Sequence, residues 1–280
     1  MRLRGIRKSR NVEVRGGGRR KGGRAGGVGI LGVLAVLAIG YFTGIDVSGL
    51  LQQGGVPQQE TRAPVSEGDD EMTRFSAQIL ATTEDVWTKV FREQLDREYI
   101  APKLVVFNGI TQSPCGGASG ATGPFYCPAD SQAYLDTSFF NMLSQQMGAK
   151  GDFAAAYVIA HEVAHHVQNQ LGILPKVDAA RRNSSKIDAN ALTVRLELMA
   201  DCLSGVWARN VEGLLERGDI QEALNAARKI GDDHLQRQAG RVPQPHTFTH
   251  GTSEQRAQWF ARGFDQGQVG QCDTFAAAQL

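Results

Sequence analysis

The chain has 280 residues, 41% of them hydrophobic and 21% charged, and a formal net charge of +1 at pH 7. These values are ordinary for a globular protein of one large or two small domains. The charge is unevenly divided, because residues 1–24 carry ten Lys or Arg and one Glu, which leaves 20 basic and 28 acidic residues in the remainder. A net charge of −8 there excludes nucleic acid as an expected partner of that part.

An uncharged stretch, AGGVGILGVLAVLAIGYFTGI, covers residues 25–45 and is long enough to cross a hydrocarbon layer of ~30 Å. The basic cluster before it predicts a cytoplasmic tail at 1–24 and everything after Asp46 outside, in the periplasm or beyond the cell. A cleaved signal peptide is the main alternative, although the basic region is long and no clear A-x-A site follows. Nucleic-acid binding by the Arg/Gly-rich tail is a third interpretation, but the predicted membrane topology already accounts for the basic charge of the tail.

Residues 46–70 have the Gly, Gln, Pro and acid content of a flexible linker, so the folded domain is predicted to span residues 71–280. Helical periodicity continues from Phe75 to Leu95, with an expected interruption near Thr82. Strand patterns follow at 103–110 and within 125–136, and further helices are predicted at 137–147, 152–171, 189–211, 217–229, 231–238 and 252–265. The fold class predicted from this pattern is a helix-rich α+β domain with a small sheet, preceded by one transmembrane helix.

The four cysteines, Cys115, Cys127, Cys202 and Cys272, contain no C-x-x-C pair, so structural zinc or redox chemistry is not indicated. Disulfides are the expected state, and of the three possible pairings we favour Cys115 with Cys127 and Cys202 with Cys272. Four free buried thiols are the alternative, which a cytosolic domain would favour.

The strongest chemical signal is His161-Glu162-Val163-Ala164-His165, within the predicted helix 152–171. Residues four apart lie on one helix face, so His161 and His165 can present two imidazole nitrogens to one ion about 2.0 to 2.1 Å away. Glu162 can then act as general base on a zinc-activated water. The alternative is a solvated helix face, but this trio inside an otherwise apolar helix favours one catalytic zinc ion.

A catalytic zinc takes a third protein ligand and leaves a position for water. Glu197 and Asp201 form the only E-x-x-x-D of the chain, four apart on the predicted helix 189–211. Glu197 can ligate the metal while Asp201 accepts the second ring N–H of a ligand histidine. Alone, E-x-x-x-D often marks two solvent-exposed carboxylates. It indicates a metal site only in combination with H-E-x-x-H.

The segments HEVAHHVQ, LELMADC, FYCPADSQAYLD and HGTSEQR together resemble the bacterial neutral zinc metallopeptidase family over about residues 71–280 plus the basic tail and apolar segment. The resemblance implies a zincin-type fold of the gluzincin kind, with His161, His165 and Glu197 as ligands and Glu162 as base. Many relatives have Gly at the position of Ala164; Ala is small and a better helix former, so we expect the site to survive. The resemblance identifies no substrate.

By similarity to other gluzincins, His250 in HGTSEQR is expected to donate to the tetrahedral intermediate. The alternative is a helix N-terminal turn, with Thr252 or Ser253 as cap and Glu254 or Gln255 completing a capping box.

By similarity to zincins generally, the strand at 131–135 is expected to be the sheet edge to which an extended peptide adds. His166 points off the metal face and is expected to be structural or to support the ligands. His234 and His246 carry no signal beyond that of surface histidines.

The function predicted from these residues is zinc-dependent hydrolysis of peptide bonds in a peptide or protein substrate, by a membrane-anchored endopeptidase. One alternative is a zinc hydrolase of another amide or an ester, since the metal site does not encode the bond cleaved. The other is a non-catalytic, zinc-stabilised extracytoplasmic binding module, against which the intact Glu162 speaks. Oligomeric state and biological process are not indicated.

Overall fold

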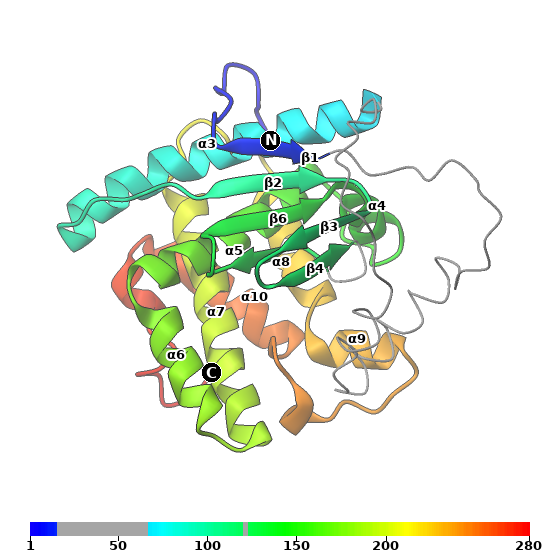
Figure 1. Ribbon diagram of the computed structural model, residues 1–280, viewed down its shortest axis with the longest axis vertical. Helices are drawn as coiled ribbons and strands as arrows, with labels where there is room; N and C mark the ends of the chain where they lie inside the picture. Colours follow the sequence, from blue (N-terminus) through cyan, green and yellow to red (C-terminus); the bar gives the residue numbers. More distant parts are fainter. Residues whose placement is uncertain (16–66, 120–122) are drawn as a thin grey trace.

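The computed structural model describes residues 1–15, 67–119 and 123–280, and Figure 1 shows their helices gathered around a small sheet. Four strands form the sheet in the order β1-β2-β6-β5. Their bounds are β1 Val12–Arg15, β2 Lys103–Phe107, β5 Phe125–Cys127 and β6 Gln132–Asp136. The strands β1, β2 and β6 are parallel, and β5 is antiparallel to β6. Two further strands, β3 Ile110–Ser113 and β4 Gly116–Ser119, pair as a separate hairpin.

The central strand β2 is buried on both faces, as a run of apolar residues without alternation predicts for a parallel strand. Because successive side chains point to opposite faces, Leu104 and Val106 join the main core under the helices. Val105 and Phe107 pack with Tyr134 in a smaller cluster on the other face.

Eight helices surround the sheet within the described residues. They are α3 Glu67–Leu95, α4 Thr137–Gln145, α5 Asp152–Gln170, α6 Ile173–Arg182, α7 Lys186–Asn210, α8 Asp219–Lys229, α9 Asp232–Gln238 and α10 Ser253–Gln266. Short 3₁₀ turns lie at Pro245–Thr247 and Val269–Cys272. The helix-rich α+β class with a small sheet is therefore confirmed.

The helices differ from the sequence prediction in two places. The expected break near Thr82 does not occur, because the Thr82 and Thr83 hydroxyls donate to the carbonyls one turn earlier and remain within a continuous α3. The helix α6 was not predicted; Gly172, with φ of 73°, ends α5, and Pro175 lies in the first turn of α6, where its missing N–H costs nothing.

The expectation that the strand at 131–135 is a sheet edge is wrong. The strand β6 lies between β2 and β5, with Lys103 opposite Gln132 on one side and Phe125 opposite Tyr134 on the other. The segment 125–136 holds two strands rather than one, and the end strand on this side of the sheet is β5.

Residues 1–15 are an integral part of the domain, beyond the pairing of β1 with β2. Glu84 of α3 is buried, and its carboxylate accepts hydrogen bonds from Ser9 Oγ at 2.5 Å and Asn11 Nδ2 at 2.8 Å. The guanidinium of Arg7 lies 2.9 Å from the second oxygen of the same carboxylate. The basic residues of this segment are therefore partly used in ion pairs with the domain itself.

The predicted membrane topology is contradicted. A single crossing between residues 1–24 and the domain would place β1 and β2 on opposite sides of a membrane, whereas they are neighbouring strands of one sheet. Among the helices of the described residues, none has both the length and the apolar character that a membrane crossing requires. The apolar stretch 25–45 that carried the prediction lies outside the described residues.

The favoured disulfide pairing is present. Cys115 is bonded to Cys127, which ties the β3–β4 hairpin to β5, and Cys202 of α7 is bonded to Cys272 in the last 3₁₀ turn. The second bond fastens the C-terminal end of the chain to the helix that carries Glu197.

Replacing Glu84 tests the attachment of residues 1–15. Glu84→Ala leaves the donors of Ser9, Asn11 and Arg7 without their shared acceptor, so we expect a loss of roughly 1–3 kcal/mol in the free energy of unfolding, measured by urea denaturation. Glu93→Ala, at an exposed position of the same helix, is the control and should have little effect. Equal stabilities of the two variants would contradict this attachment.

Candidate metal centre

The H-E-x-x-H motif lies on α5, which runs through the middle of the core. Every residue from Phe153 to Gln168 is buried, so this helix is covered on all sides. Its first turn is held by Glu222 of α8, whose carboxylate accepts the backbone N–H of Phe153 at 3.1 Å. His161 and His165 face the same side one turn apart, with ring centroids 4.8 Å from each other.

Glu197 reaches both histidines from the neighbouring helix α7. One carboxylate oxygen lies 3.1 Å from His161 Nε2, and the other lies 3.5 Å from His165 Nε2. Ligands of a tetrahedral zinc ion at 2.0–2.1 Å are about 3.3 Å apart, and the two distances fall on either side of this value. The three side chains, with one donor atom each within 4.8 Å of the others, therefore fit a zinc ion.

Both histidines have their Nδ1 atoms engaged on the side away from Glu197. His161 Nδ1 donates to Asp201 Oδ1 at 2.9 Å, and His165 Nδ1 donates to Gln168 Oε1 at 2.9 Å. The amide of Gln168 is itself fixed, since its nitrogen donates to the carbonyl of Leu196 at 2.7 Å. These partners select the tautomers that leave both Nε2 atoms free to bind a metal.

The electrostatics of the cluster favour a bound cation. Burial alone raises the pKa of Glu197, but His165, His250 and His161 hold it well below its usual range. Burial lowers the pKa of His161, but Asp201 and Glu197 outweigh this and raise it to about 10. A metal ion must displace such protons, so its affinity rises with pH.

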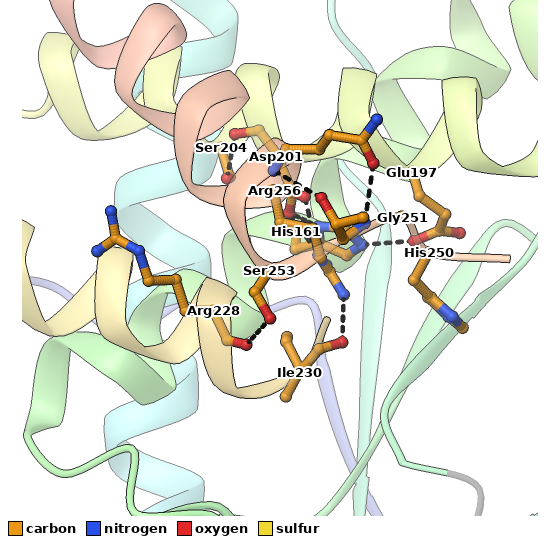
Figure 2. Close-up of polar contacts among 12 residues, drawn as sticks. His161, Glu197, Asp201, Ser204, Arg228, Ile230, His250, Gly251, Ser253 and Arg256 are labelled. Carbon is orange, nitrogen blue, oxygen red and sulfur yellow. Dashed lines mark hydrogen bonds and ion pairs between the residues drawn. The ribbon is translucent and has the colours of Figure 1, made fainter. Parts of the chain in front are cut away.

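Asp201 is the centre of a buried polar network, drawn in Figure 2. Besides His161, it contacts Arg256 of α10 through both oxygens, with Nε at 2.9 Å and Nη2 at 3.1 Å. The hydroxyl of Tyr157, on α5, donates to Asp201 Oδ1 at 2.5 Å. Asp201 therefore takes the position predicted for it, beside the second nitrogen of His161.

His250 lies near Glu197 (Figure 2), and the two side chains interact electrostatically. Asp232 holds the segment, because its Oδ2 accepts the backbone N–H groups of Thr249, His250 and Gly251 at 2.7, 2.6 and 3.0 Å. Its Oδ1 lies 3.4 Å from His250 Nδ1. Burial lowers the pKa of His250, but Glu197 and Asp232 raise it above its ordinary value.

The capping interpretation of HGTSEQR is confirmed. The Thr252 side chain accepts the backbone N–H of Gln255, and the Gln255 side chain accepts the backbone N–H of Thr252. The two interpretations are compatible, because the capping box begins two residues after His250, which lies before the first turn of α10.

The other histidines lie apart from the cluster. His166 is buried, and its ring connects Tyr126 of β5, at 3.0 Å, to the carbonyl of Ile100, at 2.6 Å. Burial lowers the pKa of His166, which agrees with a neutral structural residue. His246 is exposed on the loop before His250.

Four residues of the site were not predicted from the sequence, namely Gln168, Asp232, Arg256 and Tyr157. Gln168 follows His165 by three positions and is the one with a usable local signal, since that spacing places it on the same helix face. The other three approach from separate elements, and their types and spacing are common in ordinary helices.

The fold and the site define a helix-rich α+β domain with an H-E-x-x-H helix and, on a neighbouring helix, the carboxylate of Glu197 as a candidate third metal ligand. The chain belongs to the family described as "putative neutral zinc metallopeptidase", which matches residues 1–275. It is 48% identical over 286 aligned residues to the uncharacterized protein YpfJ of Escherichia coli K12, covering 98% of this chain and 99% of that protein. It is 37% identical to the uncharacterized proteins Rv2575 of Mycobacterium tuberculosis H37Rv and Mb2605 of Mycobacterium bovis, covering 85% of each chain. No solved structure matches the chain.

The Asp232 contacts predict a pH-dependent stability. Burial raises the pKa of Asp232, but the His250 side chain and the backbone N–H groups of His250 and Thr249 hold it below its ordinary value. The contribution of Asp232 to the free energy of unfolding is therefore fully present above its unfolded pKa of about 3.9. It is lost as pH falls through the lower folded pKa.

Asp232→Asn should cost roughly 1–3 kcal/mol in unfolding free energy at pH 7. The difference in unfolding free energy between wild type and variant should become smaller below about pH 4, as measured by urea unfolding at a series of pH values. Asp178→Asn, on a partly exposed turn of α6, is the control. A gap that stays constant from pH 7 to pH 3 would show that the carboxylate charge is not what holds the loop.

Proposed function

We propose that this protein is a zinc-dependent endopeptidase. The observation that carries the proposal is the convergence of His161, His165 and Glu197 on one point, with Glu162 between the two histidines on the same helix. Membership of a family named for zinc metallopeptidase activity supports it. A purely structural zinc site is normally closed by four protein ligands and has no use for Glu162.

A zinc ion held by His161, His165 and Glu197 would supply a Lewis acid that polarises the scissile carbonyl and lowers the pKa of the attacking water to ~7. Glu162 takes the proton of that water and passes it to the nitrogen of the departing amine. Burial raises the pKa of Glu162 above its ordinary value, although His161 and His165 oppose the shift, and a raised pKa makes this carboxylate a stronger base.

His250 is proposed to donate a hydrogen bond to the oxygen on which negative charge develops. Glu197 and Asp232 raise the pKa of His250, which favours its protonated, donating form, and Asp232 restrains both its backbone and its ring. A donor fixed in advance in this way stabilises the transition state more than the ground state.

The end strand β5 is proposed as the part of the sheet that an extended peptide substrate joins. The hydroxyl of Tyr126, on β5, accepts a hydrogen bond from Asn169 Nδ2 at 3.0 Å and lies 3.0 Å from His166 Nδ1. Both partners belong to α5, so this strand is tied directly to the helix that carries the candidate metal ligands.

The first test compares the wild type with Glu162→Gln, and both are made as the full chain because residues 1–15 contain strand β1 of the sheet. We expect the wild type to hold one zinc and to cleave a denatured protein mixture at pH 7. Glu162→Gln should keep the zinc while activity falls by about 10²-fold or more, since it can accept no proton. Zinc is measured by atomic absorption, and Glu98→Gln, at an exposed position, is the control.

The outcomes separate the candidate functions. Zinc without cleavage of any protein, but with turnover of small esters or amides, would indicate a hydrolase of another bond. Zinc with no turnover at all would indicate a binding module. A folded wild type that binds no zinc would disprove the proposal.

The role of His250 is tested by His250→Ala. We expect kcat to fall by about 10²- to 10³-fold with a much smaller change in KM, because the lost hydrogen bond forms in the transition state. His246→Ala, on the exposed loop nearby, should behave as wild type. An unchanged kcat in His250→Ala would end this assignment.

A further inference from the structure

Arg256 is a buried cation that the proposed reaction does not use. The residue is only 2% exposed, and burial of a guanidinium is costly unless its donors are paired. Its Nε and Nη2 donate to the two oxygens of Asp201, and its Nη1 donates to the carbonyl of Ile230 at 3.2 Å. The two-point contact with Asp201 fixes the plane of that carboxylate, which a single contact would not do.

Tyr157 adds a second restraint on the same carboxylate. Asp201 Oδ1 accepts from the Tyr157 hydroxyl and faces His161 Nδ1, while the Tyr157 oxygen lies 3.3 Å from Arg256 Nη2. Tyr157 and Arg256 thus hold the Oδ1 atom of Asp201 in the direction of the His161 ring. None of these contacts lies on the side of His161 that faces Glu197.

The helices that carry this network are in backbone contact. A Cβ atom at Gly263 of α10 would lie 1.8 Å from the carbonyl oxygen of Cys202, and one at Gly205 of α7 would lie 2.1 Å from the carbonyl oxygen of Phe260. The disulfide from Cys202 to Cys272 joins α7 to the turn that follows α10. Arg256 therefore extends from a helix whose backbone is packed closely against the helix that carries Asp201.

We propose that Arg256, assisted by Tyr157, is a positioning residue for the metal centre. It orients Asp201 so that this carboxylate fixes the tautomer and ring direction of His161, although Arg256 itself touches neither metal nor substrate. The C-terminal helix α10 thereby contributes to zinc affinity as well as to packing. The inference rests on the zinc site of the proposed function.

The test measures the dissociation constant of Zn²⁺ for the full chain by competition with a chromophoric chelator. Arg256→Lys keeps the buried positive charge but cannot hold both oxygens of Asp201, so zinc binding should weaken about 10- to 100-fold. The thermal midpoint of the metal-free protein reports any purely structural effect separately. Arg262→Lys, further along α10, is the control and should bind zinc as the wild type does.

Two further variants keep the test decisive. Tyr157→Phe preserves the ring and removes only the donor to Asp201, so it carries the test if Arg256→Lys does not fold. It should weaken zinc binding severalfold. In an Asp201→Asn background, Arg256→Lys should have little further effect on zinc affinity, because the group through which it acts has been altered.

Wild-type zinc affinity in folded Arg256→Lys or Tyr157→Phe would overturn the inference and leave the proposed function intact. An equal loss from Arg256→Lys with and without Asp201→Asn would also overturn it, since Arg256 would then act by another route. Absence of zinc binding in the wild type would overturn the proposed function and this inference together.

Discussion

The crossing of α5 and α7 is the constraint on which the rest of the structure depends, because it places ionisable groups in the middle of an apolar core. His161, Glu162 and His165 come from one helix, and Glu197 and Asp201 from the other. Buried charges are tolerated only when they are paired and hydrogen-bonded. Many of the buried hydrogen bonds and ion pairs around these groups provide that pairing.

Each compensating partner comes from a different part of the chain. Arg256 neutralises Asp201 from α10, and Gln168 supports His165 from within α5. Asp232, at the start of α9, holds the segment that presents His250. The C-terminal half thus acts as a supporting shell: α10 approaches α7 at two glycines, and a disulfide joins α7 to the turn that follows α10.

The sequence was informative where chemistry and spacing coincide locally. H-E-x-x-H and E-x-x-x-D each place two functional groups one helical turn apart. Both pairs could therefore be predicted as site residues from local spacing, without knowing that the two helices pack together. Arg256 could not be found in this way, because its partner is 55 positions away and the pairing depends on how two helices cross. The charge of residues 1–24 was misleading for a related reason: the positive-inside rule reads charge without its partners, and Arg7 has a partner in Glu84.

The position of β1 has a consequence for the order of assembly. This strand lies far ahead of its hydrogen-bonding partner along the chain, because β2 begins only at Lys103, and the pairing is parallel. Parallel contacts between distant segments form slowly, because closing the long intervening chain costs entropy before the contacts can contribute any stabilisation. The strand β1 therefore cannot reach its native place until the chain has been made as far as β2.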